Sequence, residues 1–334
     1  MSLYDIDTPF IPIHRLPAAL VEACLDRDLD PEKLLRGTGL FMDDVQRGDR
    51  LLQPAHCFRL IDNASRLGPA ELPFLTGHRL FPGNYGPAGA AWTNAANLLD
   101  ALRILERFAS TLSPLWWPRL TMEGGGARLY WSNACGGAAN AEFLNALMMT
   151  AVSSFCQWLG ERPFPWHYAV PGRVKHPEQY AVHWGPNLQE NSRSCFMWIE
   201  RDSLLAPWPR SSASAAASAI AQATQNSSGE LKGFVAYVDH HLMETIDQAP
   251  SMEKLAMHLG VSTATLKRRF KKHDTHFQAR YDQVRQQLAI DWLTRQGLSV
   301  EEVARRLHFH DGRNLRRAFK RWTGVLPSSL LGTA

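Results

Sequence analysis

One sequence pattern occurs twice near the end of the chain. The first copy, residues 251–270, reads SMEKLAMHLGVSTATLKRRF, and the second, residues 299–319, reads SVEEVARRLHFHDGRNLRRAF. Their apolar positions coincide at an offset of 48 residues before the turn and 49 after it, because the second copy has one residue more. Two copies with the same spacing predict two copies of one structural unit.

Each copy is predicted to be a helix, a tight turn and a second helix. Ser251 and Ser299 stand where an N-cap belongs, and acidic residues follow in the first turn. Apolar residues then recur at steps of three and four, which gives each helix one buried stripe. In the first copy, Gly260 is expected to form the turn and Ser262 to cap the second helix.

The second helix of each copy is predicted to turn a polar face outward. In the first copy this face holds Thr263, Thr265, Lys267 and Arg268, and in the second it holds Arg313, Asn314, Arg316, Arg317 and Lys320. Apolar-backed helices with Arg, Lys, Asn and Thr on the open side suit the base edges and phosphates of duplex DNA. A single Arg-rich helix is more often an ordinary solvated surface, but two aligned and capped copies favour DNA binding.

The spacer between the copies, residues 277–296, has helical periodicity. At 1.5 Å per residue such a helix is about 30 Å long. Major grooves on one face of B-DNA repeat at about 34 Å. One chain is therefore expected to place two recognition helices in adjacent grooves.

These residues resemble the DNA-binding domain of AraC/XylS-type transcription regulators. The segment LHFHDGRNLRRAFKRWTGVLP, residues 307–327, is similar to the signature of that family, although His308 and His310 replace its usual Gly and small polar residue. The resemblance implies RNA polymerase as a partner. It also implies that base edges are read by Ala264, Lys267 and Arg268 in the first recognition helix and by Arg313, Asn314 and Arg317 in the second.

Charge is distributed unevenly over the 334 residues. The segment 231–334 holds 17 Lys and Arg against 10 Asp and Glu, a net charge of +7, whereas the rest of the chain has a net charge of −3. A positive end and a mildly acidic front half predict that DNA binds to one end and another partner to the other. The length also favours two domains over a single core.

The front half is predicted to be a mixed α/β (α+β) domain, residues 1–205, ahead of an all-α domain with two helix-turn-helix motifs, residues 231–334. We expect a hairpin at residues 118–131, where two strand-like runs flank a Gly triplet, and a long helix at residues 142–159. The order of these elements is similar to the sensor domain of one branch of the same regulators, named after arabinose binding. This resemblance implies a ligand-sensing or dimerising module without identifying the ligand.

Aromatic residues are dense in this part of the chain, and nine of the 11 Trp residues lie before Ser211. Such rings can line an apolar effector pocket, and they can equally belong to a large core. The candidates for effector contacts are Tyr85, Trp92, Trp117, Tyr130, Trp131 and Trp166.

Residues 206–230 are rich in Ala and Ser and nearly uncharged, and they are predicted to link the two domains, with a middle that is able to form a helix. The first helix of the DNA-binding domain is expected over residues 231–246. Its apolar side chains repeat at helical spacing.

The remaining features point away from several other classes. Five scattered cysteines without a CxxC pair fit a reducing cytoplasm better than a disulfide frame or a zinc site, and the N-terminus lacks a basic-then-apolar signal. His167, His176 and His183 are spaced too widely for ligands on one helix. We expect no catalytic residues, no metal and no cofactor.

The sequence thus predicts a cytoplasmic, sequence-specific DNA-binding transcription regulator, controlled by a small-molecule effector in the front domain and able to form a homodimer. Two alternatives remain open at this stage. In the first, the front domain is an enzyme fused to the DNA-binding tail, and in the second it is a pure dimerisation module. Whether the output is activation or repression is not fixed by these residues.

Overall fold

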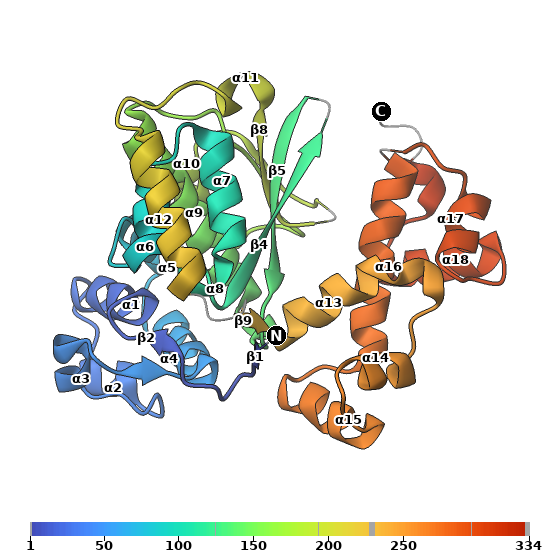
Figure 1. Ribbon diagram of the computed structural model, residues 1–334, viewed down its shortest axis with the longest axis horizontal. Coiled ribbons are helices and arrows are strands. Elements are labelled where there is room, and N and C mark those ends of the chain that lie inside the picture. The colour runs from blue at the N-terminus through green and yellow to red at the C-terminus, as the bar shows by residue number, and fades with distance from the viewer. Residues whose placement is uncertain (1, 124, 193, 227–230, 295, 331–334) are drawn as a thin grey trace. The chain divides into compact units, whose positions relative to one another are not determined.

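The computed structural model describes residues 2–123, 125–192, 194–226, 231–294 and 296–330. The chain divides into two compact units, Met1–Gly233 and Phe234–Ala334. The first is a mixed α/β unit and the second is helical, as the sequence predicts (Figure 1). No helix among the described residues combines the length and the apolar content needed to cross a bilayer.

The first unit is built around a five-stranded sheet with the order β4-β5-β8-β6-β7. Its strands are β4 (Trp116–Glu123), β5 (Gly126–Asn133), β6 (His167–Ala169), β7 (Leu188–Gln189) and β8 (Phe196–Glu200). The hairpin of β4 and β5 pairs Trp116 with Asn133 and Glu123 with Gly126, which confirms the hairpin expected from the sequence. Among the described strand pairs of this sheet, β6 and β7 are parallel and the others are antiparallel.

Helices cover one face of this sheet (Figure 1). The helices of the first unit are α1 (Leu16–Leu25), α2 (Pro31–Leu35), α3 (Met42–Arg47), α4 (Pro54–Leu67), α5 (Leu72–Leu80), α6 (Gly86–Thr93), α7 (Leu98–Arg107), α8 (Ala109–Leu112), α9 (Ala141–Gly160), α10 (Pro177–Trp184), α11 (Arg201–Leu204) and α12 (Ala213–Asn226). The long helix α9 is the predicted apolar helix, and α5 packs closely on it. A Cβ on Gly77 of α5 would lie 2.6 Å from the carbonyl oxygen of Leu147, so the close approach requires glycine here.

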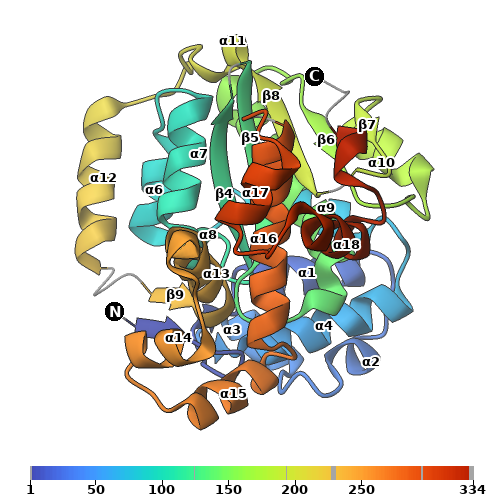
Figure 2. The same cartoon turned by 90° about the vertical axis from the view of Figure 1, so that its right-hand side faces the viewer.

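The Ala/Ser-rich segment forms helix α12, which packs on α6 (Figure 2). Ala219 and Ala223 are buried in the core of the first unit. Arg107 of α7 donates a hydrogen bond to the Thr224 hydroxyl at 3.1 Å. The middle of the predicted linker is thus part of the first compact unit.

Short strands join the N-terminus of the chain to the segment that precedes the second unit. Strand β1 (Ser2–Tyr4) pairs in parallel with β9 (Leu231–Gly233), and β2 (Ile11–Pro12) pairs with β3 (Leu51–Leu52). The predicted helix over residues 231–246 therefore begins later than expected, at Phe234. The three residues before it, Leu231–Gly233, form β9 and pair with β1. A Cβ on Gly233 would lie 2.2 Å from the carbonyl oxygen of Ala134, so the backbone approach requires glycine.

The second unit consists of the two predicted helix-turn-helix copies and the helices that carry them. Its helices are α13 (Phe234–Glu244), α14 (Met252–His258), α15 (Thr263–Lys272), α16 (Phe277–Thr294), α17 (Val300–Arg306) and α18 (Gly312–Thr323). Among the described residues, short 3-10 turns lie at Ala138–Asn140, Ile246–Gln248 and Pro327–Leu330. Two of these turns lie in the second unit.

Candidate functional site

The first helix-turn-helix, α14 and α15, begins each helix with a serine cap. The Ser251 hydroxyl accepts a hydrogen bond from the backbone N–H of Lys254 at 3.2 Å, and that of Ser262 accepts one from Thr265 at 3.1 Å. Between the helices, Gly260 has φ +65° with no atom within 4 Å of where a Cβ would lie. The caps and the turn are those that the sequence predicts.

Helix α15 has one buried and one open face. Leu266 and Phe270 are fully buried, whereas Ala264, Lys267 and Arg268 are exposed. Thr263 and Thr265 are half-buried at the helix start. The Arg268 guanidinium donates a 3.4 Å hydrogen bond to the Thr265 hydroxyl, so these two side chains lie together on the open face.

The second helix-turn-helix, α17 and α18, is capped by different residues. Ser299 and Glu302 form a reciprocal capping box at the start of α17. Asp311 caps α18 by accepting a 2.7 Å hydrogen bond from the N–H of Asn314, and this bond lowers the pKa of the Asp311 carboxyl. Sequence reasoning missed this cap, although an Asp three residues before Asn314 is a recognisable capping signal.

The turn of the second copy holds His308 in the left-handed region, at φ +57°. Its Nε2 donates a 2.7 Å hydrogen bond to the carbonyl oxygen of Ile246, which lies outside the repeat. The guanidinium of Arg285 lies over the rings of Tyr281 and Phe309, at 4.1 and 4.5 Å from their centroids. Side-chain contacts thus hold a turn whose left-handed backbone conformation usually favours glycine.

Helix α18 repeats the two-faced design of α15. Leu315, Ala318 and Phe319 are buried, and the predicted DNA-contacting residues Arg313, Asn314, Arg316 and Arg317 are all exposed. Arg316 differs from the others because it forms a 2.8 Å ion pair with Glu301 of α17. In the described part of the chain, Arg313 and Arg317 have no carboxylate within 4 Å.

Helix α16 joins the two copies: it follows α15 in the chain, precedes α17, and contacts α18 through Arg321, whose guanidinium lies 3.1 Å from the Asp282 carboxylate (Figure 1). Its 18 residues span about 27 Å. Arg280 anchors α16 to α13 through a buried, two-point ion pair with Asp239, in which Nε donates at 2.8 Å. The length of this helix is of the same order as the distance between successive major grooves on one face of B-DNA, about 34 Å.

Comparison with known proteins identifies both halves of the chain. The model for the arabinose-binding N-terminal domain of AraC transcription regulators matches residues 29–205, more than half of the sequence. The chain belongs to the AraC family of transcription regulators. A helix-turn-helix domain model matches residues 255–332, so this AraC-type regulator is a DNA-binding protein.

Individual relatives of the regulator agree with this assignment. The ornithine utilization regulator of Pseudomonas aeruginosa is 28% identical over 270 residues, which is 78% of each chain. An uncharacterized HTH-type transcriptional regulator of Mycobacterium tuberculosis is 34% identical over 97 residues, 29% of this chain and 28% of that protein. Among solved structures, the transcriptional regulator CdpR of Pseudomonas aeruginosa covers 93% of this chain and 96% of its own, at 18% identity and a TM-score of 0.44.

The six candidate effector residues of this AraC-type regulator lie in different environments. Tyr85, Trp92, Trp131 and Trp166 are buried, whereas Trp117 and Tyr130 are half-buried. Trp92 packs against Phe155, with ring centroids 4.1 Å apart, as a core residue does. Tyr85 borders a small apolar cavity.

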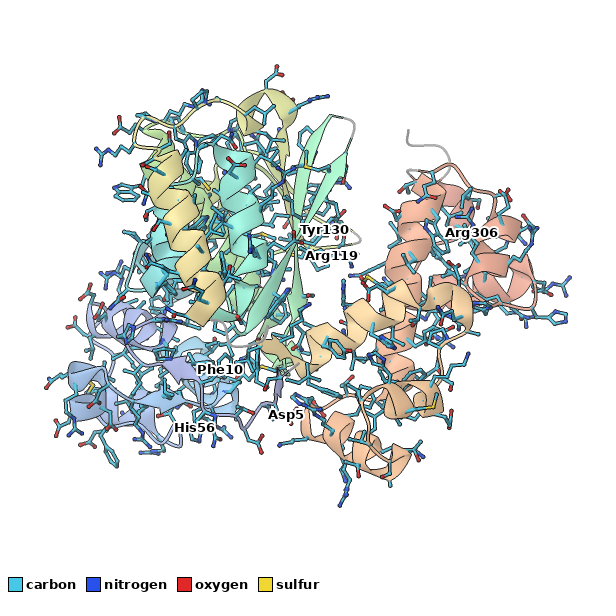
Figure 3. All side chains as sticks on the ribbon, viewed as in Figure 1. Asp5, Phe10, His56, Arg119, Tyr130 and Arg306 are labelled. Atoms are coloured by element: carbon cyan, nitrogen blue, oxygen red, sulfur yellow. The ribbon has the colours of Figure 1, made fainter. Side chains whose placement is uncertain are left out.

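Successive side chains of a strand point to opposite faces of the sheet, and this explains why Tyr130 and Trp131 lie in different environments. Trp131 pairs across the hairpin with Pro118, on the face where Trp116 hydrogen-bonds Asn145 of α9. Tyr130 pairs with Arg119 and therefore lies on the other face of the sheet, where Figure 3 labels both residues side by side. On that face the rings of Tyr130 and Phe196 are 5.6 Å apart.

A second, open hollow of about 660 Å³ lies beside α5 and α9. The Ser154 hydroxyl is 2.6 Å from Nδ1 of His78, whose Nε2 is 3.0 Å from Nδ1 of His183. Burial lowers the pKa of both histidines, and the proximity of His78 lowers that of His183 further. No cluster of three His, Cys, Asp or Glu suited to a metal ion occurs among the residues that the structure describes.

Proposed function

We propose that the regulator reads two neighbouring DNA boxes, one with α15 and one with α18. The observation that carries this proposal is the matched pair of capped recognition helices in the two copies that α16 joins, each with its basic face open. The residues proposed to face DNA are Thr263, Ala264, Thr265, Lys267, Arg268, Arg313, Asn314, Arg316 and Arg317. Among them, the ion pair with Glu301 favours a phosphate-positioning role for Arg316 over a base-reading role.

We further propose that the first unit senses a small-molecule effector and passes its state to the DNA-binding unit. The match to the sensor domain of the family supports this role. The pairing of β1 with β9 supports the coupling, because β9 continues directly into α13. An effector needs only a different affinity for two arrangements of the first unit to shift DNA binding.

The division of labour in this proposal follows the compact units. The first unit, with α12 packed on it, binds the effector or a second copy of the chain, and the second unit binds promoter DNA in the cytoplasm next to RNA polymerase. Ornithine is the first compound to test as an effector, since a relative at 28% identity is named for ornithine utilization.

Binding to sites with one box scrambled tests which recognition helix reads which box. Electrophoretic mobility shifts are measured for the full chain on a selected site, and on the same site with either box scrambled. The variant Lys267→Ala/Arg268→Ala is expected to be insensitive to scrambling of one box, and Arg313→Ala/Arg317→Ala to scrambling of the other. If both variants respond to the same box, the proposed pairing of helices with boxes is wrong.

A further inference from the structure

The two recognition helices, α15 and α18, can be compared position by position. Each is capped by the residue before it, and each cap binds the third backbone N–H of its helix. Ser262 accepts a hydrogen bond from the N–H of Thr265 at 3.1 Å, and in α18 the Asp311 carboxylate accepts one at 2.7 Å. The two caps are 49 residues apart, the same offset as the apolar positions after the turn. Hydrogen bonds and sequence therefore give the same equivalent positions.

The fifth position is basic in both helices and lies close to an acidic residue of the preceding helix. Arg316 of α18 forms the ion pair with Glu301 of α17. In the first copy, the pKa of the Glu253 carboxyl is lowered by its own backbone N–H, by a serine hydroxyl and further by the charge of Lys267. This arrangement suits contacts with phosphate, which position a protein on DNA without reading its sequence.

The second position differs between the two helices. It is Ala264 in α15 and Arg313 in α18, and both are exposed. Each lies four residues before an exposed arginine at the sixth position, Arg268 in α15 and Arg317 in α18. Residues four apart share one face of a helix, so the second and sixth positions face the same stretch of DNA.

The third position differs in what its polar group already binds. The hydroxyl of Thr265 lies 2.9 Å from the hydroxyl of Ser262 and accepts a 3.4 Å hydrogen bond from Arg268. The side-chain amide of Asn314 makes no hydrogen bond within the part of the chain that the structure describes. Helix α15 therefore offers a methyl group and one arginine to the bases, whereas α18 offers two arginines and a free amide.

The edges of the bases in the major groove distinguish these two sets of side chains. Arginine donates two hydrogen bonds to O6 and N7 of guanine, and asparagine pairs with N6 and N7 of adenine. An alanine side chain offers only an apolar contact, which suits the methyl group of thymine. The arginine at the sixth position of both helices predicts one guanine in each box. The second and third positions predict different bases at the same distance from that guanine.

We propose that the two boxes differ in sequence because the second and third positions of the recognition helices differ. In the box read by α18, Arg313 selects a guanine and Asn314 an adenine. At the matching place in the box read by α15, Ala264 selects a thymine. This inference rests on the proposed function, in which the two helices read two boxes, and it adds the residues that make the boxes unequal.

Selection of binding sites from a random DNA library tests the proposal on the full chain. The wild type is expected to select guanine in one box and thymine at the matching position of the other. Arg313→Ala is expected to lose this guanine preference by about fivefold to 150-fold, the range for one two-point arginine contact. Asn314→Thr is expected to lose the adenine. Ala264→Arg is expected to exchange the thymine for guanine, which makes the two boxes alike at this position.

Controls separate base readout from charge and folding. All three positions are exposed, so the variants are expected to unfold at the wild-type temperature in a thermal unfolding experiment. A new preference for guanine in Ala264→Arg cannot arise from a loss of folding. Met257→Arg adds the same charge at a side chain of α14 that is 78% exposed, and it serves as the matched control. It is expected to strengthen binding at low salt without changing the selected bases.

The possible results distinguish this inference from the two-box function on which it rests. Two boxes with the same bases at the matching positions would overturn the inference and leave the two-box function standing. An Ala264→Arg variant that keeps the thymine, or an Arg313→Ala variant that keeps the guanine, would have the same consequence. Selection of a single box, or of no sequence, would reject the proposed function together with this inference.

Discussion

His308 illustrates how one side chain stabilises a backbone conformation that usually calls for glycine. The left-handed region costs a residue with a Cβ about 1–2 kcal/mol, and the hydrogen bond to Ile246 offsets part of this cost. The sequence shows the departure from glycine, but the partner lies 62 residues away. Such a compensation is visible only in three dimensions.

Substitutions at His308 separate the cost of the left-handed backbone from the gain of the hydrogen bond to Ile246. His308→Ala keeps the strained φ and loses the hydrogen bond, so we expect the free energy of unfolding to fall by about 1 kcal/mol. His308→Gly loses the same bond but relieves the strain, and it is expected to stay within about 0.5 kcal/mol of the wild type. Differential scanning calorimetry of the full chain measures both; equal losses for Ala and Gly would contradict this account.

Arg268 and Arg317 carry the proposed base readout at the residue scale. Arg268→Ala or Arg317→Ala is expected to cost about 1–3 kcal/mol on the selected site and to relax specificity at one position. Fluorescence anisotropy titrations against a set of single-base variants of the site measure this. Arg103→Ala, which removes an exposed arginine of α7, is the control. Variants that bind every sequence as the wild type does would show that the recognition faces are misassigned.

At the scale of elements, the buried pair of Asp239 and Arg280 joins α13 to α16. Arg280→Met leaves a buried carboxylate without its partner and is expected to lower the free energy of unfolding by about 3–5 kcal/mol. The double variant Asp239→Leu/Arg280→Met replaces the pair by apolar groups and is expected to recover most of this loss. Urea unfolding, followed by circular dichroism, compares the variants; a double variant as unstable as the single one would contradict the electrostatic explanation.

The elements that sequence reasoning predicted are those with strong periodicity or caps. The two helix-turn-helix copies, the hairpin and the long helix α9 all belong to this class. The pairing of β1 with β9 was not predictable, because strands of three residues carry no alternation to detect. Helix α12 docks through Ala219 and Ala223, which offer little apolar contrast to their neighbours in sequence.

The sequence also predicts the two candidate sites, the DNA-contacting faces and the effector pocket, to different extents. The outward face of a helix follows from spacing, so Lys267, Arg268 and Arg317 lie where the sequence places them. A pocket joins residues that are distant in sequence: the hollow beside α5 and α9 brings His78 to Ser154, although nothing in the order of residues links the two. Alternation along β5 does show that Tyr130 and Trp131 face opposite sides, a signal available from the sequence.

At the scale of the whole molecule, all five cysteines are free. Burial raises the pKa of Cys24 and Cys57 to about 12, against about 8.5 in an unfolded chain. The folded state therefore holds thiol protons that the unfolded state releases. Its stability is full below about pH 8.5 and falls as the pH rises towards 12.

The reactivity of the thiols tests the burial of Cys24 and Cys57. At pH 8 we expect Cys24 and Cys57 to react with a disulfide reagent far more slowly in the native chain than in urea, because the thiolate is the nucleophile. Mass spectrometry of the labelled peptides resolves each cysteine. Rapid labelling of Cys24 or Cys57 under native conditions would contradict the assignment of these side chains to the core.

The central claim is that one chain reads two adjacent boxes. It is tested most directly by sequencing the genomic fragments that the purified full-length protein retains at moderate salt. The account predicts a motif of two boxes whose centres lie about one helical turn of DNA apart. A single box, or retention that ignores sequence and vanishes as salt is raised, would contradict it.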